Sequence, residues 1–277
     1  MIAKQNSRFI KDAIYLSYTS LNDFLRCPKS YYLKNVYRNP QTGYKLQIAS
    51  PYITLGATVH DALDWYIKQP KKPSKADTIN QFRNHWRKFR LKRGGFTSLE
   101  QEAEFGKRGL TMVENFVGNA QILEPSVPPI KFPKYILPGD VVLIGNFDFL
   151  GEKRDKSLHV VDFKTGAKDE ESPIQLYIYA ILAEANLQKP VSTASYWYLD
   201  REDGPRPVVL DPLDSTLEWL HQKAALVKKA REENKWNCVK GESACFECKQ
   251  YQAIIDGKGE FMFSDHAFKK DSYFLER

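Results

Sequence analysis

The chain has 277 residues, of which 42% are hydrophobic and 27% charged, the composition of a folded protein rather than a disordered one. No apolar run approaches the roughly 18 residues that a membrane-spanning helix requires, which argues against a transmembrane protein. Lysine and arginine number 41 against 34 acidic residues, a net charge of +7 that is compatible with an anionic partner without identifying it. Residues 1–8 lack the apolar core of a signal peptide, so we expect a cytoplasmic protein.

The first half of the chain has helical patterns and the second half alternates between strands and helices. Helices are predicted at residues 19–37, 56–68 and 98–119, with a loop at 40–51 and a proline-containing break at 125–138. Runs rich in Val, Ile, Phe and Tyr predict strands at 141–150, 158–164 and 193–199, with a hairpin at 151–157. Further helices are predicted at 173–186 and 214–233. This pattern indicates one α/β domain with a helical insertion at about 68–125.

Positive charge is concentrated between Lys71 and Arg93. This segment contains nine bases and one acid, a net charge of +8, so the rest of the chain sums to −1. Its rings Phe82, Trp86 and Phe89 recur at helical spacing, which predicts that they face the core. The bases then form either a solvated face or a surface that binds a nucleic-acid backbone. The bases we consider for DNA binding are Arg87, Lys88, Arg90 and Lys92.

Two acids and a lysine stand near the predicted hairpin. The strand that starts at Leu158 ends in Asp162-Phe163-Lys164, and strand alternation places Asp162 and Lys164 on one face and Phe163 on the other. Asp148 lies on the preceding strand, and the hairpin can bring it beside Asp162. Two converging carboxylates suit a hard divalent cation such as Mg²⁺. A simple surface salt bridge between Asp162 and Lys164 is the alternative.

Three short motifs follow one another along the chain: Gly145-x-x-Asp148, Asp162-x-Lys164-Thr165-Gly166 and Gln175-x-x-x-Tyr179. Their order and spacing resemble those of the RecB-like nucleases of the PD-(D/E)xK superfamily. The resemblance implies a restriction-endonuclease-like α/β core with a mixed central sheet and flanking helices. It also implies that Mg²⁺ or Mn²⁺ binds to Asp148, Asp162 and the carbonyl of Phe163, and that Lys164 positions or activates the attacking water. Gln175 and Tyr179 would line the DNA site.

The resemblance extends to a histidine in the predicted 56–68 helix. The segment Gly56-x-x-x-His60 is similar to the helix that supplies a histidine metal ligand in this family, which implies ligation by His60. A single helical histidine is otherwise an ordinary packing or surface residue. Many members also carry a further acid on an earlier strand, for which Glu124 is the nearest candidate. The other histidines have no comparable motif: His85, His159, His221 and His266.

The four cysteines are an independent signal. Cys27 is separated by 211 residues from Cys238, which is followed by Cys245 and Cys248. A Cys-x-x-Cys pair in a reducing compartment favours metal binding or redox chemistry over a disulfide, and four thiolates suit a [4Fe–4S] cluster or a structural Zn²⁺. The arrangement resembles the iron-sulfur staple of RecB-like nucleases, which joins the two ends of the chain. Its Cys-x₆-Cys-x₂-Cys spacing departs from the usual Cys-x₂-Cys-x₅-Cys, so Zn²⁺ stays as the alternative.

Together these features predict a metal-dependent deoxyribonuclease similar to CRISPR-associated and AddB-type nuclease domains. We expect an exonuclease on single-stranded or end-processed DNA, acting in recombination and repair, phage DNA metabolism or CRISPR adaptation in a prokaryotic, archaeal or phage-infected cell. The chain lacks the G-x-x-x-x-G-K-[ST] motif, so a helicase would have to be a separate partner. The alternative is a non-catalytic DNA-binding or assembly subunit whose metal at the cysteines is structural.

Overall fold

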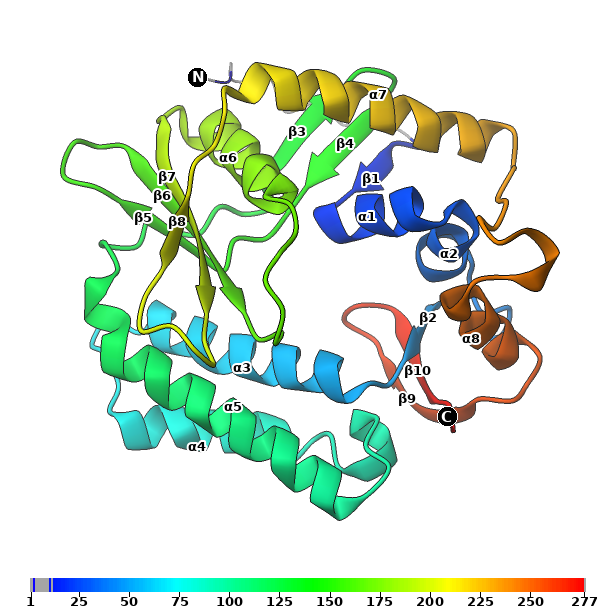
Figure 1. Cartoon of the computed structure of the whole chain (residues 1–277), viewed down its shortest axis with the longest axis horizontal. Helices are drawn as coiled ribbons and strands as arrows, with labels where there is room; N and C mark the ends of the chain where they lie inside the picture. Colours follow the sequence, from blue (N-terminus) through cyan, green and yellow to red (C-terminus); the bar gives the residue numbers. More distant parts are fainter. Residues whose placement is uncertain (1, 3–9, 11, 277) are drawn as a thin grey trace. The chain divides into compact units, whose positions relative to one another are not determined.

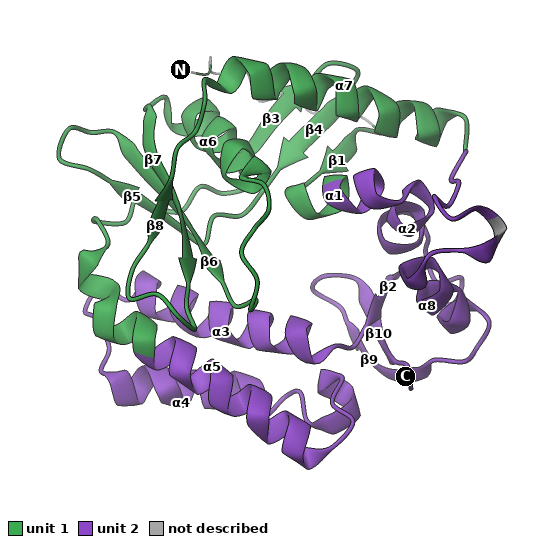
Figure 2. Ribbon diagram, in the orientation of Figure 1, with its two compact units in different colours: residues 1–21, 115–234 green, residues 22–114, 235–277 purple. Residues whose placement is uncertain are grey.

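The structure is a computed structural model that describes residues 2, 10 and 12–276 (Figure 1). Apart from Ile2, the N-terminal residues on which the absence of a signal peptide was predicted lie outside the described residues. The chain divides into two compact units (Figure 2). Unit 1 contains residues 1–21 and 115–234, and unit 2 contains residues 22–114 and 235–277, so most of unit 1 is inserted between the two segments of unit 2.

Unit 1 contains two sheets. In the first, β1 (Ile14–Leu16) is parallel to β4 (Val141–Ile144), which pairs antiparallel with β3 (Lys134–Leu137). The second has the order β5-β6-β7-β8, in which only the central pair is parallel, so the sheet is mixed. Its strands are β5 (Phe149–Glu152), β6 (Leu158–Lys164), β7 (Val191–Tyr198) and β8 (Arg206–Val208).

Both faces of the β6–β7 pair are covered. One face carries a cluster in which the Phe116 ring lies 5.3 Å from that of Phe163 and 5.4 Å from that of Trp197. Helix α6 (Ile174–Leu187), whose residues from Leu176 to Ala185 are all buried, also packs against β6 and β7. Helix α7 (Leu213–Glu232) follows. With hydrophobic packing on the sheet, the end of β6 is a rigid place for polar side chains.

Unit 2 is built from both of its chain segments. The first contributes most of α1 (Tyr18–Arg26), then α2 (Pro28–Tyr31), β2 (Lys45–Ile48), α3 (Pro51–Lys68), α4 (Lys75–Trp86) and most of α5 (Leu99–Asn119). The second contributes α8 (Phe246–Ile255), β9 (Glu260–Asp265) and β10 (Lys270–Phe274). In the sheet of order β2-β10-β9, the parallel β2–β10 pair joins the two segments.

Four predicted elements differ from the structure. The strand predicted at 141–150 is two strands in different sheets, because the Gly145-Asn146 pair favours a break over a continuous strand. The helix predicted at 19–37 breaks at Cys27, whose φ of −165° is extended, as the residue before a proline prefers. The loop predicted at 40–51 contains β2, and the proline-containing break at 125–138 contains β3.

Among the described residues, no helix is long and apolar enough to cross a membrane.

Candidate active site

The polar cluster at the end of β6 begins with Asp162 and Lys164. Strand alternation places them on one face, and Lys164 Nζ lies 3.0 Å from Asp162 Oδ2. Asp162 is 2% exposed. Because β6 lies between β5 and β7, this pair projects from an interior strand of its sheet rather than from an edge. The geometry is therefore that of a buried, fixed ion pair and not of a mobile surface salt bridge.

Asp148 reaches the same strand end from the connection between β4 and β5. Its Oδ2 accepts a hydrogen bond of 2.9 Å from the backbone N–H of Phe163. The β5–β6 ladder starts at Phe149 opposite Val161, so the carboxylate occupies the place of the next backbone partner. In an extended strand the N–H and C=O of one residue face the same neighbour, which places the Phe163 carbonyl on the Asp148 side as well.

Helix α6 adds an amide and a phenol to the two acids and the lysine. Gln175 Oε1 accepts a hydrogen bond of 2.7 Å from Lys164 Nζ, and Gln175 Nε2 donates to Asp162 Oδ1 at 2.7 Å and to Tyr179 Oη at 3.2 Å. Burial, and then the charges of Asp162 and Asp148, raise the pKa of Tyr179, so its hydroxyl stays protonated. Both acids thus act on the same phenol, which indicates that they converge near it.

Gly145 explains how the break after β4 passes close to α6. A Cβ at this position would lie 2.9 Å from Leu182 Cδ1 and 3.0 Å from Tyr179 Cε1. A side chain here would therefore displace the helix residues or the strand break. The glycine of the Gly-x-x-Asp motif allows the backbone to approach Tyr179 before the chain reaches Asp148.

Glu170 is a site residue that the sequence did not predict. It lies on the loop between β6 and α6, and its Oε1 is 2.9 Å from Lys164 Nζ. Burial lowers the pKa of Lys164, but the charges of Asp162 and Glu170 and hydrogen bonds to both outweigh it, so the pKa is raised and the ammonium is favoured. The only signal was the acidic run Asp169-Glu170-Glu171 between two motifs, which has no periodicity to interpret.

Glu124 lies elsewhere. Its Oε2 is 2.8 Å from His159 Nδ1, and His159 Nε2 is 2.8 Å from the hydroxyl of the fully buried Ser195. Alternation along β6 puts His159 on the same face as Phe163, opposite Asp162. Glu124 is therefore part of a core network rather than a further acid beside Asp162. His159 thus has a carboxylate partner, and so does His85, whose Nδ1 lies 2.9 Å from Asp61 Oδ2. The sequence indicated neither pair.

The sequence model of the PD-(D/E)XK nuclease superfamily matches residues 15–253. The chain belongs to this superfamily. A crystal structure described as "Putative exonuclease" from Eubacterium rectale has a similar fold, with a TM-score of 0.54 and 10% sequence identity over 85% of this chain and 87% of that one. No curated protein matches the sequence significantly.

Membership makes this PD-(D/E)XK chain a phosphodiester hydrolase of a superfamily that generally uses divalent metal ions. The donor set at the end of β6 fits such an ion, because carboxylate and backbone carbonyl oxygens are the ligands that Mg²⁺ and Mn²⁺ prefer. His60 lies half-buried on α3 of unit 2, whereas both carboxylates belong to unit 1. Its coordination to the same ion remains a prediction.

The four cysteines of the nuclease come together in unit 2. Their sulfur atoms all lie within 4.8 Å of one another, and Cys27 Sγ is 3.6 Å from Cys248 Sγ. Cys27 and Cys248 are buried in a core with Leu46 and Tyr251. Burial raises the pKa of the Cys238 thiol, but hydrogen bonds from the backbone N–H groups of Lys240 and Cys245 help lower it to about 6. A lowered pKa favours the thiolate, which is the form of cysteine that binds metal ions.

The sulfur spacing bears on the kind of metal. A tetrahedral ion with Zn–S bonds of about 2.3 Å holds its sulfur ligands about 3.8 Å apart, close to the Cys27–Cys248 distance. The four thiolates of a [4Fe–4S] cluster bind four different iron atoms and so stand further apart. The described cysteines form no disulfide.

The basic segment forms one wall of a groove between α4 and α5. The groove has a volume of about 560 Å³. Its lining includes the basic residues Arg83, Arg87, Arg90 and Lys107 and the apolar residues Phe82, Trp86, Leu99 and Leu110. Lys88 and Lys92 do not line it, and Lys92 Nζ pairs with Glu260 at 2.7 Å. Phe82 is 1% exposed and stacks on Trp86 at 5.5 Å, as predicted for core-facing rings, while Trp86 is half-buried.

Proposed function

We propose that the chain is a metal-dependent deoxyribonuclease. The observation that carries the proposal is the convergence of Asp148, Asp162, Lys164 and Gln175 at the end of β6. Asp148, Asp162 and the Phe163 carbonyl would hold Mg²⁺ or Mn²⁺, with His60 as a further ligand. When bound, the ion polarises the scissile phosphate and lowers the pKa of a coordinated water.

The remaining roles belong to the protein. The ammonium of Lys164, held by Gln175, positions the attacking water and stabilises the negative charge that develops on the phosphate. Gln175 also fixes the orientation of Asp162, because one amide contacts both the lysine and the acid. Tyr179 supports that amide and, with it, faces the DNA.

For the substrate, we propose DNA with free ends, degraded as single strands by exonucleolytic cleavage. The resemblance to RecB-like nucleases and the similar fold of the Eubacterium rectale protein, described as an exonuclease, support this proposal. A helicase, or another recombination or CRISPR-adaptation protein, would supply such ends in a cytoplasmic setting. We further propose that both units act as one nuclease domain with the helical insertion at about 68–125.

Cleavage of end-labelled linear DNA and circular single-stranded DNA, each with Mg²⁺ or Mn²⁺, tests this function. We expect the linear strand to shorten from its ends, the circle to stay intact, and Asp162→Ala to be inactive while it still binds DNA. Cleavage of the circle would show that the protein is an endonuclease rather than an exonuclease. DNA binding without cleavage by the wild-type protein would instead support the non-catalytic assembly subunit.

We propose that the cysteine site holds a structural metal centre that joins the two segments of unit 2. The cysteine order in the resemblance supports a [4Fe–4S] cluster, and the 3.6 Å sulfur spacing supports a single Zn²⁺. Iron, sulfide and zinc analysis of anaerobically purified protein decides between them, together with the visible absorption that only the cluster gives.

The groove between α4 and α5 is our candidate for the DNA-binding surface outside the active site. An apolar floor with a cationic rim is the combination that single-stranded nucleic acid requires, because bases stack on rings while phosphates contact arginine and lysine. Among the described residues, no acid forms an ion pair with Arg83, Arg87 or Lys107, whereas Arg90 pairs with Glu102. We therefore assign the main phosphate contacts to Arg83, Arg87 and Lys107, and only secondary ones to Lys88, Arg90 and Lys92.

A further inference from the structure

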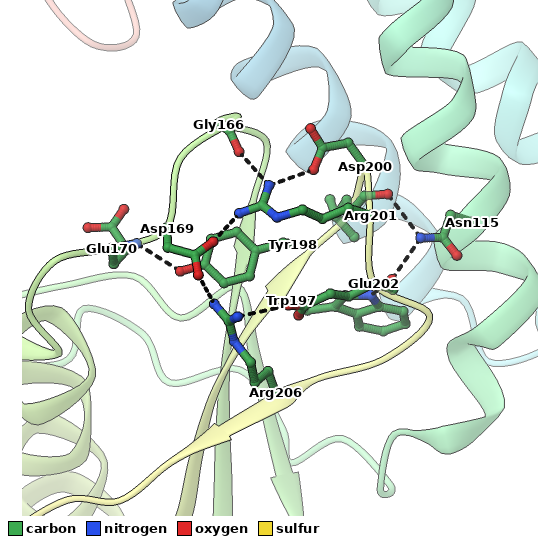
Figure 3. Close-up of polar contacts among 11 residues, drawn as sticks. Asn115, Gly166, Asp169, Glu170, Trp197, Tyr198, Asp200, Arg201, Glu202 and Arg206 are labelled. Atoms are coloured by element: carbon green, nitrogen blue, oxygen red, sulfur yellow. Dashed lines mark hydrogen bonds and ion pairs between the residues drawn. The ribbon is translucent and has the colours of Figure 1, made fainter.

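The loop between β6 and α6, residues 165–173, connects the candidate catalytic lysine to a group of arginines. Its Asp169 accepts from two of them, one on each oxygen: Arg201 Nη2 lies 2.5 Å from Oδ1 and Arg206 Nη2 lies 2.8 Å from Oδ2 (Figure 3). The Gly166 carbonyl accepts from Arg201 at 3.2 Å. Since the next residue after Asp169 is Glu170, these contacts fix the backbone that carries Glu170.

Tyr198 anchors the same loop from β7. Its hydroxyl accepts a hydrogen bond of 2.8 Å from the backbone N–H of Glu170. The guanidinium carbons of Arg201 and Arg206 lie 4.1 and 4.6 Å from its ring centroid, and the ring is 1% exposed. Cation–π contacts of this kind restrict both arginines and the tyrosine. We call Asp169, Tyr198, Arg201 and Arg206 the arginine clamp.

The connection from β7 to β8 carries Arg201 and leads into Arg206, and side-chain donors hold it in place. Asn115 Nδ2 donates to the carbonyls of Leu199 and Glu202 at 3.0 and 2.8 Å, and Trp197 Nε1 donates to the Glu202 carbonyl at 2.8 Å (Figure 3). Trp197 has no exposed surface. The arginine clamp is therefore held by residues packed in unit 1, and it fixes the position of Glu170.

The charges at the site give Glu170 a role. In this structure the ammonium of Lys164 pairs with Asp162 Oδ2. A divalent cation bound to Asp162 would compete for this oxygen. Glu170 offers the ammonium a second carboxylate at 2.9 Å, which stays available when the metal takes the first. The formal charges of Asp148, Asp162, Glu170 and Lys164 leave two net negative charges, the number that one divalent ion neutralises.

We propose that Glu170 is a positioning residue that keeps Lys164 at the active site once a metal occupies Asp162, and that the arginine clamp sets the position of Glu170. The inference rests on the proposed nuclease function. It assigns the 165–173 loop a part in catalysis without contact to metal or DNA.

The first experiment follows Lys164 directly. Lysines are acetylated with limiting reagent, with and without Mg²⁺, and quantified by mass spectrometry in the wild-type protein, Glu170→Ala and Glu171→Gln. Glu171→Gln is the matched control, because it removes a neighbouring exposed acid. We expect Mg²⁺ to leave Lys164 protected in the wild type and control, and to increase its reactivity several-fold in Glu170→Ala. Equal protection in Glu170→Ala overturns the proposal whether or not the protein cleaves DNA.

Kinetics and metal binding separate positioning from ligation. Glu170→Ala should lower kcat about 10- to 100-fold with KM changed less than about twofold, because a displaced lysine affects the reaction rather than DNA binding. Glu170→Asp, which keeps the charge, should recover part of the loss, and its Mn²⁺ affinity measured by electron paramagnetic resonance should equal that of the wild type. Weaker Mn²⁺ binding in Glu170→Asp would make Glu170 a metal ligand and overturn the positioning role. Failure of the proposed function would appear differently, as an inactive wild-type protein.

The clamp is tested through Tyr198→Phe, which keeps the buried ring and removes only the hydroxyl. We expect faster hydrogen exchange in the 165–173 loop and a lower kcat at an unchanged melting temperature. If the hydroxyl acts through Glu170, the kcat effect of Tyr198→Phe disappears in the Glu170→Ala background. Additive losses in the double variant would show that the tyrosine acts independently, against the proposal.

Discussion

Asp162 and Asp148 differ in burial and in the hydrogen bonds that their carboxylates accept. Asp162 accepts hydrogen bonds on both oxygens, from Gln175 and from Lys164, and is almost completely buried. Asp148 is half-buried and accepts from the backbone of Phe163. The same chemical change therefore has different structural consequences at the two positions.

Asp162→Asn and Asp148→Asn should both abolish cleavage, because each removes a proposed metal ligand. An amide at 162 has one acceptor oxygen for two donors, so a buried donor loses its partner and unfolding should become easier by about 1–3 kcal/mol. An amide at 148 can still accept from Phe163, so its stability should stay near the wild-type value. Denaturant unfolding and a cleavage assay measure the two effects, and full activity in either variant would remove that acid from the site.

Gly145 is predicted to be critical although it has no functional group. In Gly145→Ala the Cβ would lie 2.9 Å from Leu182 and 3.0 Å from Tyr179, an overpacking that we expect to cost about 1–3 kcal/mol and to lower activity by displacing the phenol from Gln175. Gly118→Ala on α5 is the control, since nothing lies within 4 Å of the added Cβ. Equal behaviour of the two variants would contradict the proposed close approach.

At the scale of elements, the sequence predicted the strand that carries the motif but not the breaks around it. The predicted strand at 158–164 has the same bounds as β6, because its Leu-His-Val-Val-Asp-Phe-Lys run is apolar, β-branched and bounded by turns. The 141–150 run has similar composition, yet it changes sheets at Gly145. A change of sheet depends on which strands are available as partners, which local composition does not record.

The candidate site shows the same division. Residues in motifs with a fixed spacing, such as Asp162, Lys164 and Gln175, were predicted and do meet in the structure. Glu170 and Lys107 were missed, because one lies in a loop and the other on a helix that approaches the basic segment only in the folded chain. Tertiary contacts, rather than local sequence propensity, bring Glu170 to Lys164 and Lys107 to the groove.

The groove between α4 and α5 gives a prediction for these helices. The triple variant Arg83→Gln, Arg87→Gln, Lys107→Gln should weaken binding of single-stranded DNA and reduce its salt dependence, with about 0.7 lost from the slope for each phosphate contact removed. DNA should also quench the total tryptophan fluorescence more in the wild type than in Trp86→Phe. The control triple Lys156→Gln, Lys229→Gln, Lys258→Gln removes equal charge from exposed sites outside the groove. An equal change in slope for both triples would make the effect one of net charge alone.

For the whole molecule, unit 2 depends on contacts between segments that are far apart in the sequence. The β2–β10 pair and the four cysteines both join residues 22–114 to residues 235–277. Glu247 adds polar contacts across the same junction, since Ser30 and Lys34 both donate to its carboxylate, at 2.6 and 2.8 Å. Loss of the proposed metal should therefore loosen this junction without separating it.

Cys27→Ser tests how much the metal contributes. A link between Cys27 and Cys248 closes a loop of more than 200 residues, so it should stabilise the protein by several kcal/mol, roughly as a long-loop disulfide does. The variant should lose its metal and melt at a lower temperature, with faster hydrogen exchange near both Cys27 and α8. Activity should fall less than in Asp162→Asn. Unchanged metal content in Cys27→Ser would place the metal on the C-terminal three cysteines alone.

The parallel pairing of β2 with β10 also has a consequence during synthesis. Ile48 pairs with Tyr273, so about 225 residues must leave the ribosome after β2 before its partner exists. At 5–20 residues per second, this takes about 10–45 s. During that interval unit 1 can fold as an inserted body, while β2 keeps an unpaired edge that other nascent chains could join. Unit 2 is thus completed only after the residues of unit 1 have been synthesised, and slow or interrupted translation after α7 should increase aggregation.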